Sequence, residues 1–322
     1  MMQDAIKKFP EQFAYQPVIQ NKNKLKKFTS VIVLGMGGSH LAADLIRTYN
    51  LSLPLIIHSD YGLPAVEKAV LKQSLIIASS YSGNTEEVIE GLEMAKKQKL
   101  NVAVLAVGGK LIEKAKKYGL PYVQMPSTGI QPRSALGFSL IGMLALMGEK
   151  KALAECRVVS KINSAKMQKA GQALAEKLKN KVPVIYTSVR NAAVSYNWKI
   201  KLNETGKIPA FSNIFPELNH NEMTGFDVKN SSQHLSEKFY FIFILDKADH
   251  VKNQKRMKIT AKLYKDRGFA CENIEMKGKN TWEKIFSSLL LADWTAVSIA
   301  NMYGLESEQV PMVEEFKKLI EK

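Results

Sequence analysis

The segment Ser74–Thr85, with the sequence SLIIASSYSGNT, decides the fold. Its first half is a short apolar run that is typical of a buried strand, and residues 86–99 place apolar side chains at the spacing of an amphipathic helix. The turn between them contributes the hydroxyl groups of Ser80, Ser82 and Thr85. N–H groups at the start of a helix attract anions, and hydroxyl groups add donors. The turn therefore predicts a site for a phosphate monoester, and the alternative is an ordinary helix cap made by Thr85 or Ser82.

This turn differs from the loops that bind nucleotides. It contains no lysine and no GxxxxGK[ST] pattern, so it is not a nucleotide P-loop. An earlier turn, GMGGS at residues 35–39, has the first two glycines of a dinucleotide fingerprint, but His40 stands at the position of the third. We expect Gly37, Gly38 and Ser39 to let the backbone approach a ligand closely, and the alternative is a plain tight turn.

Strand-like runs alternate with helical segments along the first part of the chain. The apolar runs lie at residues 30–34, 54–58, 74–79, 101–106 and 121–125. This alternation predicts a parallel sheet covered by helices on both faces, with ligands at the carboxyl ends of the strands. A second alternation follows, with strands expected at 182–187, 239–245 and 270–276. We therefore expect an N-terminal domain over 1–150, a helical linker over 151–180 and a C-terminal domain over 181–322.

Composition is that of an ordinary globular protein, with 322 residues, of which 46% are hydrophobic and 24% charged. The net charge of +16 raises the alternative of a nucleic-acid-binding protein, but the densest basic cluster, at residues 22–27, contains no aromatic residue. We therefore expect no nucleic-acid partner. No apolar run reaches the ~18 residues of a membrane helix, and the start lacks the apolar core of a signal peptide. With only two cysteines, far apart, the chain is expected to be cytoplasmic and to have no membrane partner.

Two polar segments carry candidate catalytic side chains. Arg133 opens a very apolar helix and is expected to face an anionic substrate, the alternative being a salt bridge at the helix start. The segment 203–226 is rich in polar residues, glycine and proline, which is typical of structured functional loops. In it Glu204 and Glu222 are candidate bases and His220 is a candidate acid, although a lone loop histidine is more often structural. The other histidines show no metal-ligand spacing, and we expect neither a metal nor a cofactor.

Together these segments resemble one enzyme family. The matching motifs are GMGGS (35–39), SYSGNT (80–85), PRSALG (132–137), NETGKIPAF (203–211) and FPELNHNEMTGF (215–226). They are similar to those of the bifunctional phosphoglucose/phosphomannose isomerases, which belong to the sugar isomerase (SIS) superfamily. SxSGxT alone indicates only a SIS domain, whereas the segment around Glu204 and His220 indicates the isomerases. The resemblance covers nearly the whole chain and implies an α/β fold of two SIS domains, each a parallel five-stranded sheet flanked by helices.

The resemblance also implies a reaction. The expected enzyme is a metal-independent aldose–ketose isomerase that interconverts glucose 6-phosphate and/or mannose 6-phosphate with fructose 6-phosphate through a cis-enediolate. Glu204 would move the proton between C1 and C2, and Arg133 would stand beside the enediolate oxygens. His220 would open the sugar ring from across a dimer interface. Thr295 matches a threonine associated with accepting both the mannose and the glucose configuration. The residues that would grip the sugar phosphate are Ser80, Ser82 and Thr85.

Members of this family are homodimers, so the resemblance implies a homodimer with shared active sites that takes a small sugar phosphate. There is one departure: the family carries a lysine in the closing helix, whereas this chain has none between Lys284 and Lys317. The alternative from another class is a non-catalytic regulator that binds sugar phosphates through its SIS domains. The Glu204 and His220 pair, which such a sensor does not need, favours the enzyme.

Overall fold

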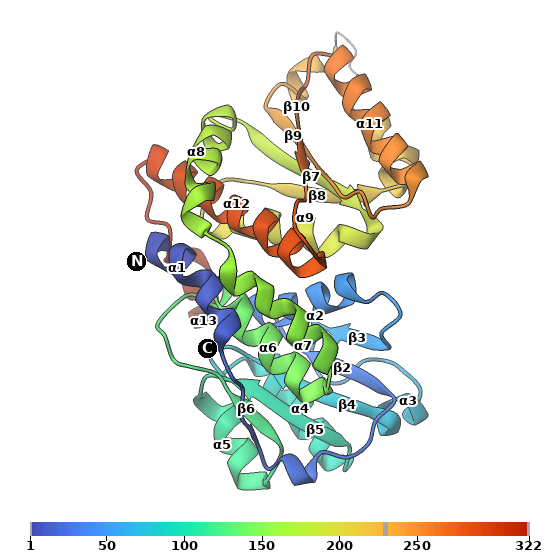
Figure 1. The fold of residues 1–322 in the computed structure, drawn as a ribbon, viewed down its shortest axis with the longest axis vertical. Coiled ribbons are helices and arrows are strands. Elements are labelled where there is room, and N and C mark those ends of the chain that lie inside the picture. The colour runs from blue at the N-terminus through green and yellow to red at the C-terminus, as the bar shows by residue number, and fades with distance from the viewer. Residues whose placement is uncertain (1, 228–230, 321–322) are drawn as a thin grey trace. The chain divides into compact units, whose positions relative to one another are not determined.

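The computed structural model describes residues 2–227 and 231–320, which divide into two compact units (Figure 1). The N-terminal unit comprises Lys8–Ile162 together with Asn280–Glu283. The C-terminal unit is built from described residues within Met1–Lys7, Asn163–Lys279 and Lys284–Lys322. The boundary in the middle of the chain therefore lies between Ile162 and Asn163.

The N-terminal unit is organised around a sheet with the strand order β1-β6-β5-β4-β2-β3. Its strands are β1 Ile19–Gln20, β2 Ser30–Leu34, β3 Leu55–His58, β4 Ser74–Ser79, β5 Asn101–Ala106 and β6 Tyr122–Gln124. Only β1 pairs antiparallel; every other pair in this sheet is parallel. Because parallel strands end at the same edge, the turns that follow β2, β4 and β5 lie at one edge of the sheet.

Helices cover both faces of this sheet. The α-helices are α2 Gly38–Tyr49, α3 Lys68–Gln73, α4 Glu86–Lys97, α5 Gly109–Tyr118, α6 Leu136–Met147 and α7 Lys150–Cys156, with 3₁₀ turns η1 Phe9–Ala14, η2 Lys22–Lys24, η3 Pro132–Ser134 and η4 Arg157–Lys161. Successive strand residues alternate between the faces: Ile76 and Ala78 join a core with α4 and α5. On the other face α6 packs so closely that a Cβ atom on Gly142 would lie 2.5 Å from Leu105.

The C-terminal unit contains a parallel sheet with the order β10-β9-β7-β8. Its strands are β7 Val182–Ser188, β8 Phe211–Phe215, β9 Phe239–Leu245 and β10 Ala270–Glu275. Its helices are α8 Gln168–Lys177, α9 Ala192–Glu204, α10 Glu222–Gly225, α11 Val251–Asp266, most of α12 Thr281–Met302, α13 Pro311–Ile320 and most of α1 Met2–Lys8, with 3₁₀ turns η5 Ser164–Met167, η6 Val189–Asn191, η7 Glu217–His220 and η8 Gln233–Leu235. An aromatic core fills one face of the sheet, where the rings of Phe241 and Tyr264 stand 4.5 Å apart.

The α/β class with parallel sheets is confirmed, but the expectation of five strands in each sheet is wrong. The N-terminal sheet adds the two-residue antiparallel strand β1 to its five parallel strands. The C-terminal sheet has four strands in the described part of the chain, and one of them, β8, was not predicted. In β8, Phe211 is exposed and Ser212 and Asn213 are polar, so the segment lacks the apolar run that marks the other strands.

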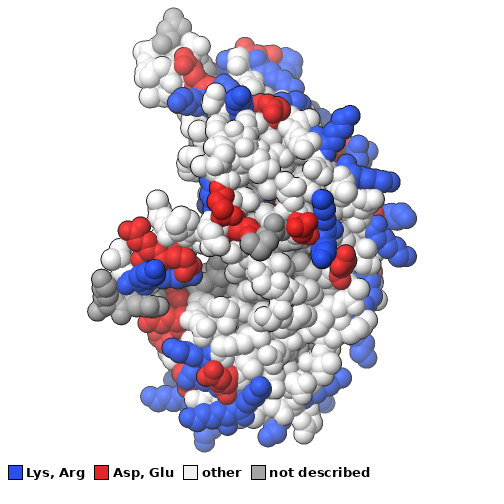
Figure 2. Space-filling model, turned by 90° about the vertical axis from the view of Figure 1, so that its left-hand side faces the viewer, with Lys and Arg blue, Asp and Glu red and all other residues white. Residues whose placement is uncertain are grey.

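One helix of the described residues, α12, is long and apolar enough to cross a membrane by length and composition, which the sequence reading did not anticipate. However, 72% of its apolar window is buried inside the protein, as in the core helix of a globular domain. On the face shown in Figure 2, lysine and arginine side chains lie in separate groups, with acidic side chains among them.

Candidate active site

The hydroxyl turn, residues 80–85, lies at the carboxyl end of β4 and leads into α4. Ser80 is 1% exposed, and its Oγ atom lies 2.7 Å from Thr85 Oγ1 and accepts the Gly83 N–H at 3.1 Å. Ser82 Oγ accepts another backbone N–H of the turn at 3.2 Å. Thr85 stands at the N-cap position of α4, but no side chain caps this helix. The interpretation as an ordinary cap made by Thr85 or Ser82 is therefore wrong.

The turn is shaped by close packing against the turn that follows β5. Gly83 has a φ of +77°, and a Cβ atom there would lie 1.8 Å from the carbonyl oxygen of Gly108. Across the same contact, the Leu111 N–H donates to the Gly83 carbonyl at 2.9 Å, and the Lys110 N–H donates to Asn84 Oδ1 at 3.0 Å. Glycine is required at position 83 because both the backbone conformation and the space exclude a side chain.

The glycine turn at residues 35–39 contacts the hydroxyl turn from the end of β2. The Tyr81 N–H donates to Ser39 Oγ at 2.9 Å. A Cβ atom on Gly38 would lie 3.2 Å from the backbone nitrogen of Arg133, whereas Gly37, with a φ of +50°, has open space where a Cβ would stand. The glycine turn therefore joins the hydroxyl turn and the Arg133 segment, and leaves room beside Gly37.

Arg133 belongs to η3 and is only 4% exposed. Gln12 holds this segment through its amide: its Nε2 donates to the Ser134 carbonyl at 2.7 Å and its Oε1 accepts the Gly137 N–H at 3.0 Å. The N-terminal unit thus brings together the segments that carry seven of the predicted site residues. These are Gly37, Gly38, Ser39, Ser80, Ser82, Thr85 and Arg133.

In the C-terminal unit, Glu204 is the last residue of α9 and is half-buried. Its carbonyl oxygen accepts a hydrogen bond from Lys207 Nζ at 2.7 Å. Lys207 has a φ of +58° and also donates to the carbonyl of Gln309. The chain therefore turns sharply just after Glu204, at a point fixed by a lysine that reaches the segment preceding α13.

His220 is the last residue of η7, directly after β8, and its side chain is exposed. The preceding Asn219 donates to Thr260 Oγ1 of α11 at 2.9 Å, and Leu218 is fully buried. Because its neighbours are anchored, His220 presents an accessible imidazole on a fixed support.

Glu222 is engaged in a different way from Glu204. Its carboxylate accepts hydrogen bonds from the Tyr186 hydroxyl and from the Asn213 amide, and its N–H donates to Asn221 Oδ1 at 2.6 Å. Both carboxylate oxygens are thus used inside the unit, where burial raises the pKa of Tyr186. Of the two candidate bases, Glu222 therefore has a structural role, because its hydrogen bonds link β7, β8 and α10.

Thr295 lies inside α12 with no exposed surface, and its hydroxyl donates to the Leu291 carbonyl at 2.8 Å. Glu204, His220 and Thr295 all belong to the C-terminal unit, and the other seven predicted site residues belong to the N-terminal unit. Within residues 2–227 and 231–320, no group of three His, Cys, Asp or Glu side chains is arranged to hold a metal ion.

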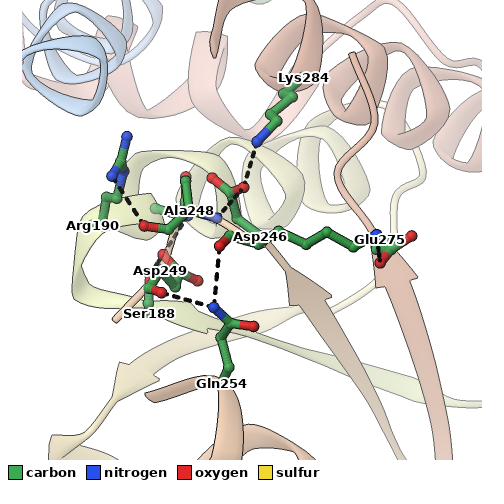
Figure 3. Close-up of polar contacts among 10 residues, drawn as sticks. Ser188, Arg190, Asp246, Ala248, Asp249, Gln254, Glu275 and Lys284 are labelled. Carbon is green, nitrogen blue, oxygen red and sulfur yellow. Dashed lines mark hydrogen bonds and ion pairs between the residues drawn. The ribbon is translucent and has the colours of Figure 1, made fainter. Parts of the chain in front are cut away.

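Sequence reasoning missed a polar cluster at the carboxyl end of the C-terminal sheet (Figure 3). Asp249 Oδ1 accepts the Ser188 hydroxyl at 2.6 Å and the Asn191 amide at 3.0 Å. Asp246 Oδ1 accepts Lys284 Nζ at 2.8 Å and the Ala248 N–H at 3.0 Å. Two aspartates directly after an apolar strand were the available signal, but their partners lie far away in the sequence.

The two aspartates are buried to the same degree, each 5% exposed, but their pKa values shift in opposite directions. Burial raises the pKa of Asp249 and outweighs the hydrogen bond from Ser188, which lowers it. Burial also pushes the pKa of Asp246 upward, but the bonds from Lys284 and the Ala248 N–H bring it below its ordinary value.

The cluster occupies the place that the hydroxyl turn has in the other sheet. β9 lies beside β7 as β4 lies beside β2, and each is the third parallel strand of its sheet in chain order. The turn after β4 offers hydroxyl donors, whereas the turn after β9 offers carboxylates that the chain itself pairs. The two sheets therefore present different groups after equivalent strands.

Comparison with known proteins identifies the family of the chain. Residues 167–320 match the family described as the bacterial phospho-glucose isomerase C-terminal SIS domain. A protein of Caldicellulosiruptor bescii named bifunctional phosphoglucose/phosphomannose isomerase is 33% identical over 312 residues, which cover 91% of this chain and 90% of that protein. A protein of Aquifex aeolicus with the same name is 30% identical over 319 residues, which cover 98% of this chain and 96% of that protein.

Among solved structures, the tagatose-6-phosphate ketose/aldose isomerase of Escherichia coli is similar with a TM-score of 0.70. The match covers 96% of this chain and 95% of that chain at 15% identity. At this identity the likeness supports the fold alone, an α/β architecture shared with phosphosugar isomerases.

Proposed function

Because the chain belongs to the family of bifunctional phosphoglucose/phosphomannose isomerases, we propose that it interconverts glucose 6-phosphate and/or mannose 6-phosphate with fructose 6-phosphate through a cis-enediolate. Membership of this family makes the chain an isomerase. The observation that carries the substrate assignment is the hydroxyl turn, because Ser80, Ser82 and Thr85 leave the start of α4 without a side-chain cap. Formation of fructose 6-phosphate by the purified chain tests the proposal.

The phosphate of the sugar binds at the hydroxyl turn. Hydroxyl groups of Ser80, Ser82 and Thr85 and the N–H groups that begin α4 donate to its oxygens. Gly37, Gly38 and Ser39 line the sugar from the neighbouring turn, with the open space at Gly37 in support. The N-terminal SIS domain, which corresponds to the unit Lys8–Ile162 with Asn280–Glu283, thus grips the far end of the substrate, and the C-terminal unit carries Glu204 and His220. Binding of the phosphate, far from the reaction, orients C1 and C2 of the sugar toward the catalytic groups.

The carboxylate of Glu204 acts as the base. It removes the proton from C2 of the open aldose, a proton then passes from the O2 hydroxyl to O1 within the enediolate, and the same carboxyl group returns its proton to C1, which gives the ketose. The half-buried position of Glu204 at the end of α9 supports this role, because Glu222 is already engaged by two donors. Arg133 stabilises the negative charge that develops on the enediolate oxygens, and its burial strengthens such an interaction.

The ring of the substrate opens before the proton moves. His220 transfers a proton between the O1 hydroxyl and the ring oxygen, and acts from the partner subunit of a homodimer with shared active sites. Its exposed side chain on an anchored turn supports this assignment. An unpaired apolar surface on α13 also supports association with a second copy; its exposed side chains are Met312, Val313, Phe316, Leu319 and Ile320.

Thr295 contributes through its size. Its hydroxyl donates to the Leu291 carbonyl, so it does not account for acceptance of both sugars through a direct hydrogen bond. The small size of the side chain accounts for it better, because it leaves space for the C2–C3 bond of the sugar to rotate. The enzyme works in the cytoplasm, which agrees with its two free cysteines, Cys156 and Cys271. It needs no metal and no cofactor, because protein groups hold the enediolate.

A further inference from the structure

A buried ion pair lies one helical turn before Glu204. Lys201 of α9 is 2% exposed, and its Nζ lies 2.6 Å from Oδ1 of Asp293 on α12, whose side chain is 10% exposed. The same two helices are joined again one turn earlier, where Trp198 Nε1 donates to Ser288 Oγ at 3.0 Å. Two buried polar links therefore tie α9 to α12, and the ionic one is nearer to Glu204.

The lysine also closes the end of its own helix. The Thr205 N–H donates to the Lys201 carbonyl at 2.9 Å, and the Gly206 N–H donates to the same oxygen at 3.1 Å. Glu204 lies between the lysine and these two donors. The side chain of Lys201 thus fixes the helix to α12, while its main chain fixes the turn from which the Glu204 carboxylate extends.

Stability alone does not explain this pair. Removing two charges from water costs several kcal/mol for each ion, and well-packed apolar residues of similar volume often stabilise a fold as well or better. An ion pair, in contrast, has one preferred geometry. The charged end of Lys201 meets Asp293 only when α9 and α12 keep the same register. A lysine at this position also stands three residues before Glu204, where side chains on one helix are neighbours.

We propose that the Lys201–Asp293 ion pair is a positioning device for the catalytic carboxylate: it holds the last turn of α9 against α12 so that Glu204 reaches C1 and C2 of the bound sugar. The inference rests on the proposed isomerase function. Neither Lys201 nor Asp293 touches substrate, and both act through the placement of Glu204. A misplacement of about 1 Å can cost about 10²-fold in rate.

The test replaces the pair by an apolar pair and compares it with the neighbouring link. Lys201→Met combined with Asp293→Leu leaves no buried charge without a partner, so the double variant is expected to fold. We expect kcat with fructose 6-phosphate to fall about 10–100-fold while KM stays within about twofold, because the phosphate turn is untouched. The matched control is Ser288→Ala, which removes the other α9–α12 link and is expected to lower the melting temperature while kcat stays within about twofold.

The inference is overturned if the folded double variant keeps kcat within about twofold of wild type, or if Ser288→Ala lowers kcat as much as the double variant does. If the double variant does not fold, Asp293→Asn, which keeps an oxygen acceptor for Lys201 without its charge, is read by the same criterion. Failure of the proposed function looks different, because wild type itself would then lack isomerase activity.

Discussion

The Ser80 hydroxyl lies 2.7 Å from the Thr85 hydroxyl, across the turn from which α4 starts. Thr85 occupies the N-cap position, where threonine ordinarily accepts an N–H of the helix, yet no side chain caps α4. The two hydroxyls therefore hold each other at the mouth of a helix whose first N–H groups lack a side-chain acceptor. A phosphate oxygen is the acceptor that such an arrangement suits.

Removal of the turn's hydroxyls should weaken sugar-phosphate binding. Hydrogen bonds to a charged group contribute about 1.5–3 kcal/mol each, so Ser82→Ala with Thr85→Ala is expected to raise the dissociation constant of fructose 6-phosphate by about a hundredfold or more. Calorimetry measures this constant directly. Ser52→Ala, which removes an exposed hydroxyl at the amino end of β3, is the matched control and should bind as wild type does. Unchanged affinity in the double variant would remove the turn from the binding site.

Substitution of the base should separate turnover from binding. Glu204→Gln keeps the shape of the side chain but cannot accept the C2 proton, so kcat is expected to fall by about 10²–10⁴ with sugar-phosphate affinity retained. Glu222→Gln is the comparison, because it replaces an acceptor for both Tyr186 and Asn213 by a group that carries two donors. It should lower the melting temperature and reduce kcat far less. If Glu222→Gln is the more damaging of the two for turnover, the assignment of the base is wrong.

Two aspartates three residues apart should respond to pH with opposite signs. The raised pKa of Asp249 means that the folded state favours its protonated form, so stability is lost as pH rises through that pKa. Asp249→Asn should therefore raise the melting temperature at neutral pH, and the gain should shrink as pH falls through the raised pKa toward about pH 4. Asp246, whose pKa is lowered, contributes stability above its ordinary pKa that is lost as pH falls. Asp246→Asn should lower the melting temperature at neutral pH, with a deficit that shrinks in acid.

Thermal unfolding of both variants beside wild type, at neutral and acid pH, checks this pair of predictions. Equal shifts of the same sign for the two variants would show that the cluster responds to the loss of a carboxylate in general, and not to the different partners of Asp246 and Asp249.

Mixing of two inactive variants tests whether active sites are shared. Glu204→Gln and His220→Ala chains are each expected to be inactive as homodimers. If His220 acts across the interface, half of the randomly paired dimers carry one site with both lesions and one intact site, so activity should return to about a quarter of wild type. Size-exclusion chromatography and a tagged chain establish that subunits have exchanged. Complete exchange without recovered activity would place His220 in the same chain's site or outside the mechanism.

Much of the fold could be predicted because apolar runs mark buried strands directly. Residues 74–79 and 239–245 have such runs, and the structure has β4 and β9 at those residues. The strand β8 could not be predicted in this way, since it begins with the exposed Phe211 and the polar Ser212 and Asn213, and its place is fixed by pairing with β7. The number of strands in each sheet depends on such edge strands, which carry little signal of their own.

Candidate site residues could be named from the sequence where one short segment carries several of them. The hydroxyls of the turn at 80–85 are visible in the sequence, as are Glu204 and His220. Contacts between distant segments were not predictable: Ser188 and Asp249 are 61 residues apart, and Lys201 and Asp293 are 92 apart. In the sequence, a lysine or an aspartate that forms a buried pair cannot be distinguished from one on the surface. Only tertiary packing identifies its partner.

The most direct test of the central claim is a coupled assay of the purified wild-type chain, in which fructose 6-phosphate formed from glucose 6-phosphate and from mannose 6-phosphate is followed over time without added metal. We predict turnover of at least one of the two sugars, abolished to the background of a Glu204→Gln control prepared in the same way. Measured binding of these sugar phosphates with no turnover of either by wild type would contradict the isomerase and identify the chain as a sugar-phosphate sensor.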